Sequence, residues 1–256
     1  MVARSGIVTL TTDFGPGDPY AAALEAALIK TWPQVHVVQV SHSISPGDVP
    51  SGAYVVEYAA RSFPPGTIHL GVVDPEVGTD RRMVAIETET FMVVGPGNGI
   101  LDRALRGQAV KGAVTLSESP EGVSRTFQSR DIMAPAAARA ASGEMLSTLG
   151  AMAQIAAPPR ALTFDPALAG NFEVAYVDSF GTLVIDARHS GTWPEGVESV
   201  QVAGQRVRAG GTFADVARGE LVIYPGSIGY VEIAARDGSA ASLLRLGAGG
   251  RVSIAP

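Results

Sequence analysis

The first 155 residues alternate between short apolar runs and segments with helical periodicity. The apolar runs are rich in branched residues and have the length of buried strands. The predicted strands are residues 7–12, 36–40, 67–73, 83–87, 91–94 and 113–116. The predicted helices are residues 20–31, 49–61, 100–105 and 132–141. This alternation predicts an α/β fold, with a mainly parallel α/β sandwich domain over residues 1–155.

The pattern changes beyond residue 170 to short strands separated by turns, with one short helix at residues 239–244. The predicted strands are residues 172–177, 183–186, 199–202, 205–207, 221–224, 230–234 and 252–254. Such spacing is typical of a small β-barrel or sandwich. An Ala-Ala-Pro-Pro stretch opens the intervening linker, residues 156–169, so the second, β-barrel-like domain covers residues 170–256.

Composition narrows the function classes. Hydrophobic residues make up 46% of the 256 residues, but no apolar run reaches the ~18 residues that a membrane span needs. Residues 1–6 lack the features of a signal peptide, so we expect a cytoplasmic protein. The absence of cysteine excludes disulfides and thiolate metal sites. A net charge of −6 without a Lys/Arg run argues against nucleic acid or an anionic membrane as the main partner.

The segment TIHLGVVDPEVGTDRR, residues 67–82, is the first candidate for chemistry. Its strand ends at Asp74-Pro75, because proline cannot continue strand pairing, and Arg81 follows a glycine-containing loop. Ligand crevices of open α/β sheets lie at the carboxyl ends of strands. Two interpretations stay open here: a ligand site, or an aspartate bonded to its own turn beside surface arginines.

Other polar loops also follow predicted strands. Asp13 follows the first strand and could accept hydrogen bonds from two vicinal hydroxyl groups, as acidic residues do for ribose. Asp18 suits a helix N-cap. His42 could be a general base, but a histidine in a serine-rich loop more often makes local hydrogen bonds. Residues 95–99, GPGNG, lack the Lys-Ser/Thr of a phosphate-binding loop, and a turn into a helix explains them.

Three further segments complete the candidates. Residues 125–131 form a polar loop that could be a second wall of a site, and Asp131 suits the N-cap of the next helix. In the second domain, residues 178–181 and 227–230 read as turns that expose aromatic and polar groups. Aromatic turns can stack on an adenine, although core packing is the commoner explanation.

Seven blocks of the chain together resemble one family, the S-adenosylmethionine (SAM) hydroxide adenosyltransferases, or SAM hydrolases, relatives of the SAM-dependent fluorinase and chlorinase. The blocks are TTDFG (11–15), SHSISPGD (41–48), HLGVVDPEVGTDRR (69–82), GPGNGIL (95–101), TFQSRDIMAPAAA (126–138), VDSFGTLV (177–184) and GSIGYVEIAARDGSAA (226–241). Seven blocks in this order are hard to obtain by chance, and they run through both domains.

The resemblance implies an enzyme that substitutes water at the ribose C5′ of SAM. The products would be adenosine and L-methionine, and neither a metal ion nor a cofactor would take part. The family forms trimers whose pocket lies between the α/β domain of one subunit and the β domain of its neighbour. A homotrimer with active sites between subunits is therefore expected.

The resemblance also assigns residues. Asp74 and Arg81 match two of three family positions around the attacking water, and Gln128 occupies the third. Asp13 matches the ribose-hydroxyl position, and Asp178 the position that holds the methionine amine. The other predicted substrate-binding residues are Phe127, Ser129, Phe180, Phe213, Ser227 and Tyr230.

Departures from the family keep alternatives open. The family histidine is Gln128 here, which cannot take a proton, so hydrolysis could be slow or the nucleophile different. Ser129 resembles a halide-contacting serine of the fluorinase. The halogenases have tyrosine at the position of Asp74, however, and a carboxylate there would repel a halide.

The second domain departs as well, since Thr182, Gly226 and Arg236 replace family asparagines. Adenine recognition is therefore less well supported than the fold. One rival interpretation is a catalytically weak or inactive SAM- or adenosine-binding protein. Another is a metal-dependent phosphohydrolase using Asp13 and Asp74, which the lack of clustered histidine and carboxylate ligands disfavours.

Overall fold

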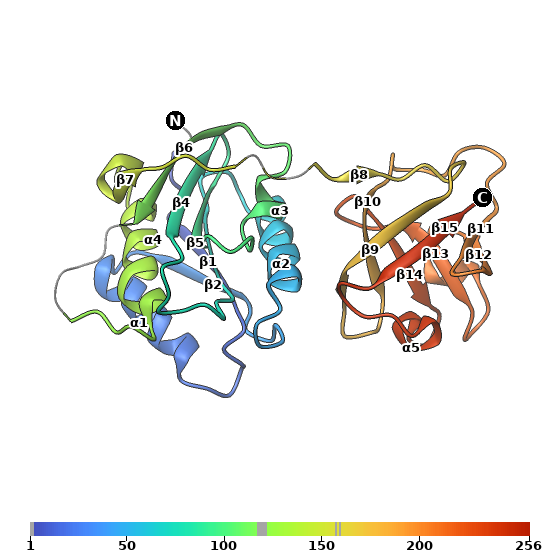
Figure 1. Cartoon of the computed structure of the whole chain (residues 1–256), viewed down its shortest axis with the longest axis horizontal. Coiled ribbons are helices and arrows are strands. Elements are labelled where there is room, and N and C mark those ends of the chain that lie inside the picture. The colour runs from blue at the N-terminus through green and yellow to red at the C-terminus, as the bar shows by residue number, and fades with distance from the viewer. Residues whose placement is uncertain (1–2, 117–121, 157, 159) are drawn as a thin grey trace. The chain divides into compact units, whose positions relative to one another are not determined.

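The computed structural model describes residues 3–116, 122–156, 158 and 160–256. The chain forms two compact units, Met1–Pro159 and Arg160–Pro256, each with its own hydrophobic core (Figure 1). Residues 157 and 159, within the Ala-Ala-Pro-Pro stretch that opens the predicted linker, lie outside the described residues.

The N-terminal unit is built on one seven-stranded sheet of order β2-β1-β3-β5-β4-β6-β7. Its strands are β1 Ile7–Thr12, β2 His36–Ser41, β3 Ile68–Val72, β4 Met83–Thr88, β5 Met92–Pro96, β6 Val110–Leu116 and β7 Gly150–Met152. The neighbours β2, β1, β3 and β5 are parallel, whereas β4, β6 and β7 are antiparallel. The predicted hairpin is β4–β5, and the parallel strands bring their carboxyl ends to one edge.

Helices cover both faces of this sheet (Figure 1). They are α1 Tyr20–Thr31, α2 Val49–Ser62, α3 Asp102–Leu105 and α4 Ala134–Ala141, the last preceded by a π-type turn at Ser129–Met133. α1 packs with α4 on one face, and α2 with α3 on the other. A side chain at Gly71 in β3 would come within 2.8 Å of Val56, so glycine permits the close approach of α2.

Two predicted helix caps are wrong. Pro19 occupies the N-cap of α1, and no side chain caps that helix, so Asp18 does not do so. Asp131 lies inside the π-type turn, where its carboxylate accepts hydrogen bonds from the Ser124 backbone N–H (2.8 Å) and from Arg130 instead. Asp48 caps α2 instead, since its carboxylate accepts from the Ser51 N–H at 3.1 Å.

The C-terminal unit is a closed barrel rather than a sandwich. Its strands are β8 Leu162–Thr163, β9 Gly170–Val177, β10 Leu183–Arg188, β11 Ser199–Val202, β12 Gln205–Ala209, β13 Leu221–Pro225, β14 Tyr230–Ala235 and β15 Arg251–Ala255, and its helix is α5 Ala240–Leu244. They pair in the order β14-β13-β12-β11-β15-β9-β10-β8, and β14 also pairs with β10, which closes the barrel. Inward-facing apolar side chains such as Leu183, Ile223 and Ile233 fill its core.

Candidate active site

Polar residues collect where the parallel strands of the N-terminal unit end. Asp13 follows β1, His42 follows β2, and Asp74 comes two residues after β3. The first two loops are bonded together, since the Gly15 N–H donates to the His42 carbonyl (2.8 Å) and the Gly47 N–H to Asp13 Oδ2 (2.8 Å). This edge is where open α/β sheets hold ligands.

The loop after β3 folds back so that Arg81 meets Asp74. Arg81 Nε donates to both carboxylate oxygens of Asp74, at 2.7 and 2.8 Å, and Nη2 also donates to Oδ2. Gly78 has φ +85°, a conformation that favours glycine, at the point where the loop turns. The side chains of Arg81 and Asp74 are only 5% and 6% exposed, so Arg81 is not a surface arginine.

Gln128 joins this pair and completes what we call the polar cluster (Asp74, Arg81 and Gln128). Arg81 Nη2 donates to Gln128 Oε1 at 2.7 Å, which leaves the amide nitrogen of Gln128 as a donor for something else. Gln128 is 7% exposed. Arg81 Nη1 is buried and has no hydrogen-bond partner among the described residues. The polar cluster therefore keeps unused donors inside a buried site.

His42 makes the local hydrogen bond that the sequence favours. Its Nδ1 lies 2.8 Å from the hydroxyl of Thr12, while its buried Nε2 finds no partner in the described part of the chain. Burial lowers the pKa of His42, and the charge of Glu25 opposes this shift in part. The imidazole is thus neutral near pH 7. Its hydrogen bond to Thr12 holds the end of β1, directly before Asp13.

Three aromatic rings, here called the aromatic triangle, lie beside these loops. Phe14, Tyr20 and Phe127 meet edge to face, with ring centroids 5.7 to 6.0 Å apart. The guanidinium of Arg130 covers the Phe127 ring at 4.7 Å. Phe14 directly follows Asp13, and Phe127 directly precedes Gln128. The sequence predicts Phe127 but not the other two, because no periodic pattern links Phe127 to Phe14, in the loop after β1, and Tyr20, at the start of α1.

Ser129, the neighbour of Gln128, is 5% exposed at the start of the π-type turn. It therefore lies at the buried end of the polar loop that the sequence predicts as a second wall of the site.

In the barrel unit, the predicted residues Asp178 and Phe180 share one tight turn. Asp178 Oδ1 accepts hydrogen bonds from the backbone N–H groups of Phe180 (2.9 Å) and Thr182 (2.8 Å). Phe180 is 79% exposed. Phe213 is 47% exposed and meets the Tyr224 ring edge to face at 5.2 Å. Phe213 therefore packs on strand β13, which carries Tyr224, whereas most of the Phe180 side chain faces solvent.

Tyr230 differs from the other predicted barrel residues. It is fully buried, and the Arg188 guanidinium lies 3.9 Å above its ring. The sequence predicts that this aromatic side chain is exposed, and this prediction is wrong. Tyr230 instead packs in the core, as the alternative interpretation expects. Ser227, in the preceding turn, is exposed.

Glu232 is a residue of this region that the sequence analysis missed. Tyr224 donates its hydroxyl to Glu232 Oε2 at 2.7 Å, and burial, reinforced by the charge of Asp178, raises the pKa of Glu232. A Cβ at Gly226 would come within 2.2 Å of Glu232 Oε1. The carboxylate therefore occupies the space of a side chain at position 226, where the family asparagine is expected.

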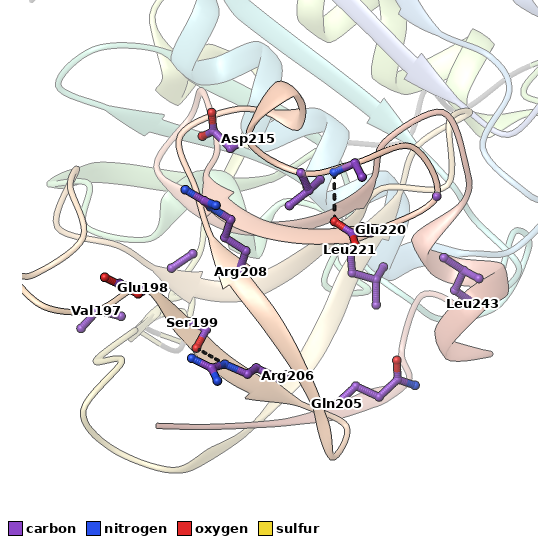
Figure 2. Close-up of a pocket in the computed structure, with 14 residues that line it drawn as sticks. Val197, Glu198, Ser199, Gln205, Arg206, Arg208, Asp215, Glu220, Leu221 and Leu243 are labelled. Carbon is purple, nitrogen blue, oxygen red and sulfur yellow. Dashed lines mark hydrogen bonds between the residues drawn. The ribbon is translucent and has the colours of Figure 1, made fainter.

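A groove of about 1060 Å³ on the barrel lies elsewhere. Figure 2 shows its charged lining, in which Arg206 donates to the Ser199 hydroxyl at 2.8 Å. The other charged lining residues are Glu198, Arg208, Asp215 and Glu220. No residue that the sequence predicts for the site lines this groove, so its size alone does not make it the site.

Among the described residues, no group of three or more His, Cys, Asp or Glu could hold a metal ion. No helix in the same residues is both long and apolar enough to cross a membrane.

Comparisons with known proteins match both units. Residues 8–150 match the family model for the SAM hydroxide adenosyltransferase N-terminal domain, and residues 172–253 match that for the C-terminal domain. An (R)-S-adenosyl-L-methionine hydrolase of Salinispora tropica is 38% identical over 255 residues, which cover 96% of this chain and 97% of that protein.

More distant relatives share the whole length. A fluorinase of Nocardia brasiliensis is 25% identical, and the alignment covers 98% of this chain and 97% of the fluorinase. The crystal structure of an uncharacterized conserved protein from Thermotoga maritima is 27% identical with a TM-score of 0.84, covering 98% of this chain and 100% of that one.

Proposed function

The chain belongs to the SAM hydroxide adenosyltransferase family, and we propose that it is an enzyme that hydrolyses SAM to adenosine and L-methionine. The observation that carries this proposal is the buried polar cluster of Asp74, Arg81 and Gln128, which joins residues from two loops through one guanidinium. The relatives named SAM hydrolase support the choice of substrate.

The reaction is a substitution at the ribose C5′. The oxygen of water forms a bond to C5′ while the C5′–S bond breaks, and its electron pair stays on sulfur. The sulfonium thereby becomes the neutral thioether of methionine, and the water loses one proton to become the 5′-hydroxyl of adenosine. Because the leaving group departs as a neutral molecule, we propose that the reaction needs neither a metal ion nor a cofactor.

The polar cluster would hold and activate the water. A carboxylate has about four lone-pair positions. Arg81 donates three hydrogen bonds to Asp74, so the carboxylate can still accept a hydrogen bond from water. The amide nitrogen of Gln128 and the unused Nη1 of Arg81 can donate to the oxygen. Gln128 cannot take the proton that the water loses. This proton would therefore pass to Asp74 late in the reaction, and then to solvent.

Other residues would bind the substrate. One oxygen of Asp13 is engaged by Gly47, which leaves the other for the ribose diol. Asp178 would hold the methionine amine, while Phe213 and Ser227 line the adenine and methionine pockets. The exposure of Phe180 and Phe213 supports a role in contacts beyond their own loops.

The family resemblance leads to two further proposals. The protein assembles as a homotrimer in which each active site takes barrel residues from a neighbouring subunit, and it works in the cytoplasm. Sedimentation of the purified chain would test the first proposal.

An incubation of the purified protein with SAM, with and without EDTA, tests the proposed function. Chromatography should detect adenosine and methionine in equal amounts in both samples. SAM that survives intact in both would contradict hydrolysis and leave a binding role. Product that disappears with EDTA would contradict the metal-free reaction.

A further inference from the structure

The glycine-rich segment at residues 95–99, which comprises the end of β5 and the loop after it, contacts both ends of the segment that carries Asp74 and Arg81. Asn98 Nδ2 donates to the carbonyl of Val73 at 2.8 Å, and the Gly97 N–H donates to the carbonyl of Arg82 at 2.8 Å. Val73 directly precedes Asp74, and Arg82 directly follows Arg81. One loop therefore holds the chain just before the aspartate and just after the arginine.

The Val73 carbonyl needs this partner. β3 ends at Val72, so the Val73 carbonyl lies beyond the strand pairing of the sheet and needs a donor from elsewhere. Val73 is fully buried, so water cannot replace a missing donor. Asn98 supplies the donor, and its own Oδ1 accepts from the Ile100 N–H at 3.3 Å, which fixes the orientation of the amide.

Small residues allow the loop to come this close. A Cβ at Gly95 would lie 2.5 Å from the Gly71 carbonyl oxygen, a contact that backbone atoms cannot relieve. A Cβ at Gly97 would lie 3.3 Å from the Arg82 carbonyl oxygen that its own N–H reaches. The loop is therefore shaped to fit against the ends of the 74–81 segment, and a simple turn does not require this fit.

The backbone of Asp74 is restrained from both directions. The residue before a proline is confined to extended conformations, so Pro75 limits Asp74 from its carboxyl side. Asn98 fixes the carbonyl on its amino side. Reacting groups that move by about 1 Å can lose on the order of a hundredfold in rate, so the placement of Asp74 matters more than the strength of any one bond.

We propose that Asn98 is a positioning residue, which sets the geometry of the Asp74–Arg81 pair by holding the Val73 carbonyl. The inference rests on the proposed function for its effect on rate, but the effect on the Asp74–Arg81 contact does not depend on it. Asn98 itself does not touch the reacting atoms.

Kinetics of three variants test this proposal. Asn98→Ala should lower kcat about ten- to a hundredfold and change KM less than about threefold, because the reacting groups move while the substrate-binding residues stay. The matched control is Gln108→Ala, which removes an amide that accepts from the Thr90 hydroxyl at 3.2 Å beside the opposite end of β5. It should leave both constants unchanged.

Asn98→Asp separates positioning from general damage. An ionised carboxylate cannot donate to the Val73 carbonyl, whereas a protonated one can. The ratio of kcat in this variant to kcat in the wild type should therefore rise as the pH is lowered and the new carboxyl gains its proton. A flat ratio would contradict the hydrogen bond as the cause.

The NMR resonance of the Arg81 Nε–H, identified by its loss in Arg81→Lys, provides a readout independent of turnover. In Asn98→Ala it should shift and exchange faster with solvent, and in Gln108→Ala it should not. If the wild type hydrolyses no SAM, the proposed function fails, but this resonance still decides the inference. A resonance and kcat that both stay at wild-type values in folded Asn98→Ala would overturn it. If Asn98→Ala does not fold, the near-isosteric Asn98→Asp provides both readouts.

Discussion

The two units present their candidate site residues in opposite ways. In the N-terminal unit, Asp74, Arg81 and Gln128 are 5 to 7% exposed and bonded to one another. In the barrel, Phe180 is 79% and Phe213 47% exposed, and the ring contact of Phe213 is with Tyr224 of β13. One site is assembled before any ligand arrives, and the other offers surfaces that a ligand or another chain can cover.

The difference agrees with the roles that we propose for the two regions. Groups that stabilise charge during a reaction act best when they are fixed in a buried, low-dielectric site. Aromatic faces that recognise a base need only to be accessible. We therefore expect changes in the polar cluster to alter kcat and changes in the barrel to alter KM.

The largest effect is expected for Asp74→Asn. The amide keeps the shape of the carboxylate but cannot take a proton, so kcat should fall by roughly 10²- to 10⁴-fold, while KM changes little. Steady-state kinetics would measure this. Because Arg81 loses its buried counter-charge, circular dichroism and a binding titration with SAM serve as controls for folding. Turnover within threefold of the wild type would refute the role of Asp74.

Asp178→Asn should give the opposite pattern in the barrel. The asparagine keeps the oxygen that accepts from the Phe180 and Thr182 N–H groups, so the turn stays intact, but it loses the charge that would hold an ammonium. A hydrogen bond to a charged group contributes about 1.5–3 kcal/mol, which corresponds to a rise in KM of about ten- to a hundredfold. A fall in kcat at unchanged KM would contradict the expectation that changes in the barrel alter KM.

Acid should destabilise the N-terminal unit in particular. Burial lowers the pKa of His69 to about 3, whereas an unfolded histidine has a pKa of about 6.5. As the pH falls below the unfolded value, the unfolded chain gains a proton that the folded unit does not. The folded unit should therefore lose about 1.4 kcal/mol of stability per pH unit until the pH nears the folded value.

The two tryptophans can report the units separately, since Trp32 packs in the N-terminal core and Trp193 in the barrel core. Trp193→Phe leaves Trp32 as the reporter, and Trp32→Phe leaves Trp193. Urea unfolding monitored by fluorescence should show the acid-dependent loss of stability in Trp193→Phe but not in Trp32→Phe. His69→Gln should weaken that dependence, and His36→Gln, at an exposed position, should leave it unchanged. Equal acid sensitivity of both reporters would contradict the assignment to His69.

The smallest effect is expected for Phe180→Ala. An exposed side chain contributes little to folding, so the free energy of unfolding should stay within about 0.5 kcal/mol of the wild type. KM for SAM should rise by about tenfold or less if the ring covers part of the bound substrate. Calorimetry and kinetics on the same preparation would measure the free energy of unfolding and KM. An unchanged KM would contradict a role of Phe180 in substrate binding.

The sequence predicted most elements of both units because strand and helix periods are local. It predicted Asp74, Arg81 and Gln128 separately, through their positions in family motifs, but not that one guanidinium bonds the other two. The missed residue Phe14 meets Phe127 from a distant segment. Glu232 bonds Tyr224 across the β13–β14 hairpin, a side-chain contact that the strand pattern alone does not reveal. The caps predicted at Asp18 and Asp131 failed for a similar reason, since Pro19 and a π-type turn replaced the expected geometry.

The central claim is that the polar cluster directs water to the ribose C5′, and a labelling experiment tests it most directly. Purified protein is incubated with SAM in water enriched in oxygen-18, and the products are analysed by mass spectrometry beside Asp74→Asn. The account predicts adenosine that carries the heavy oxygen at its 5′-hydroxyl, unlabelled methionine, and almost no product from the variant. Intact SAM, unlabelled adenosine, or equal turnover by Asp74→Asn would contradict it.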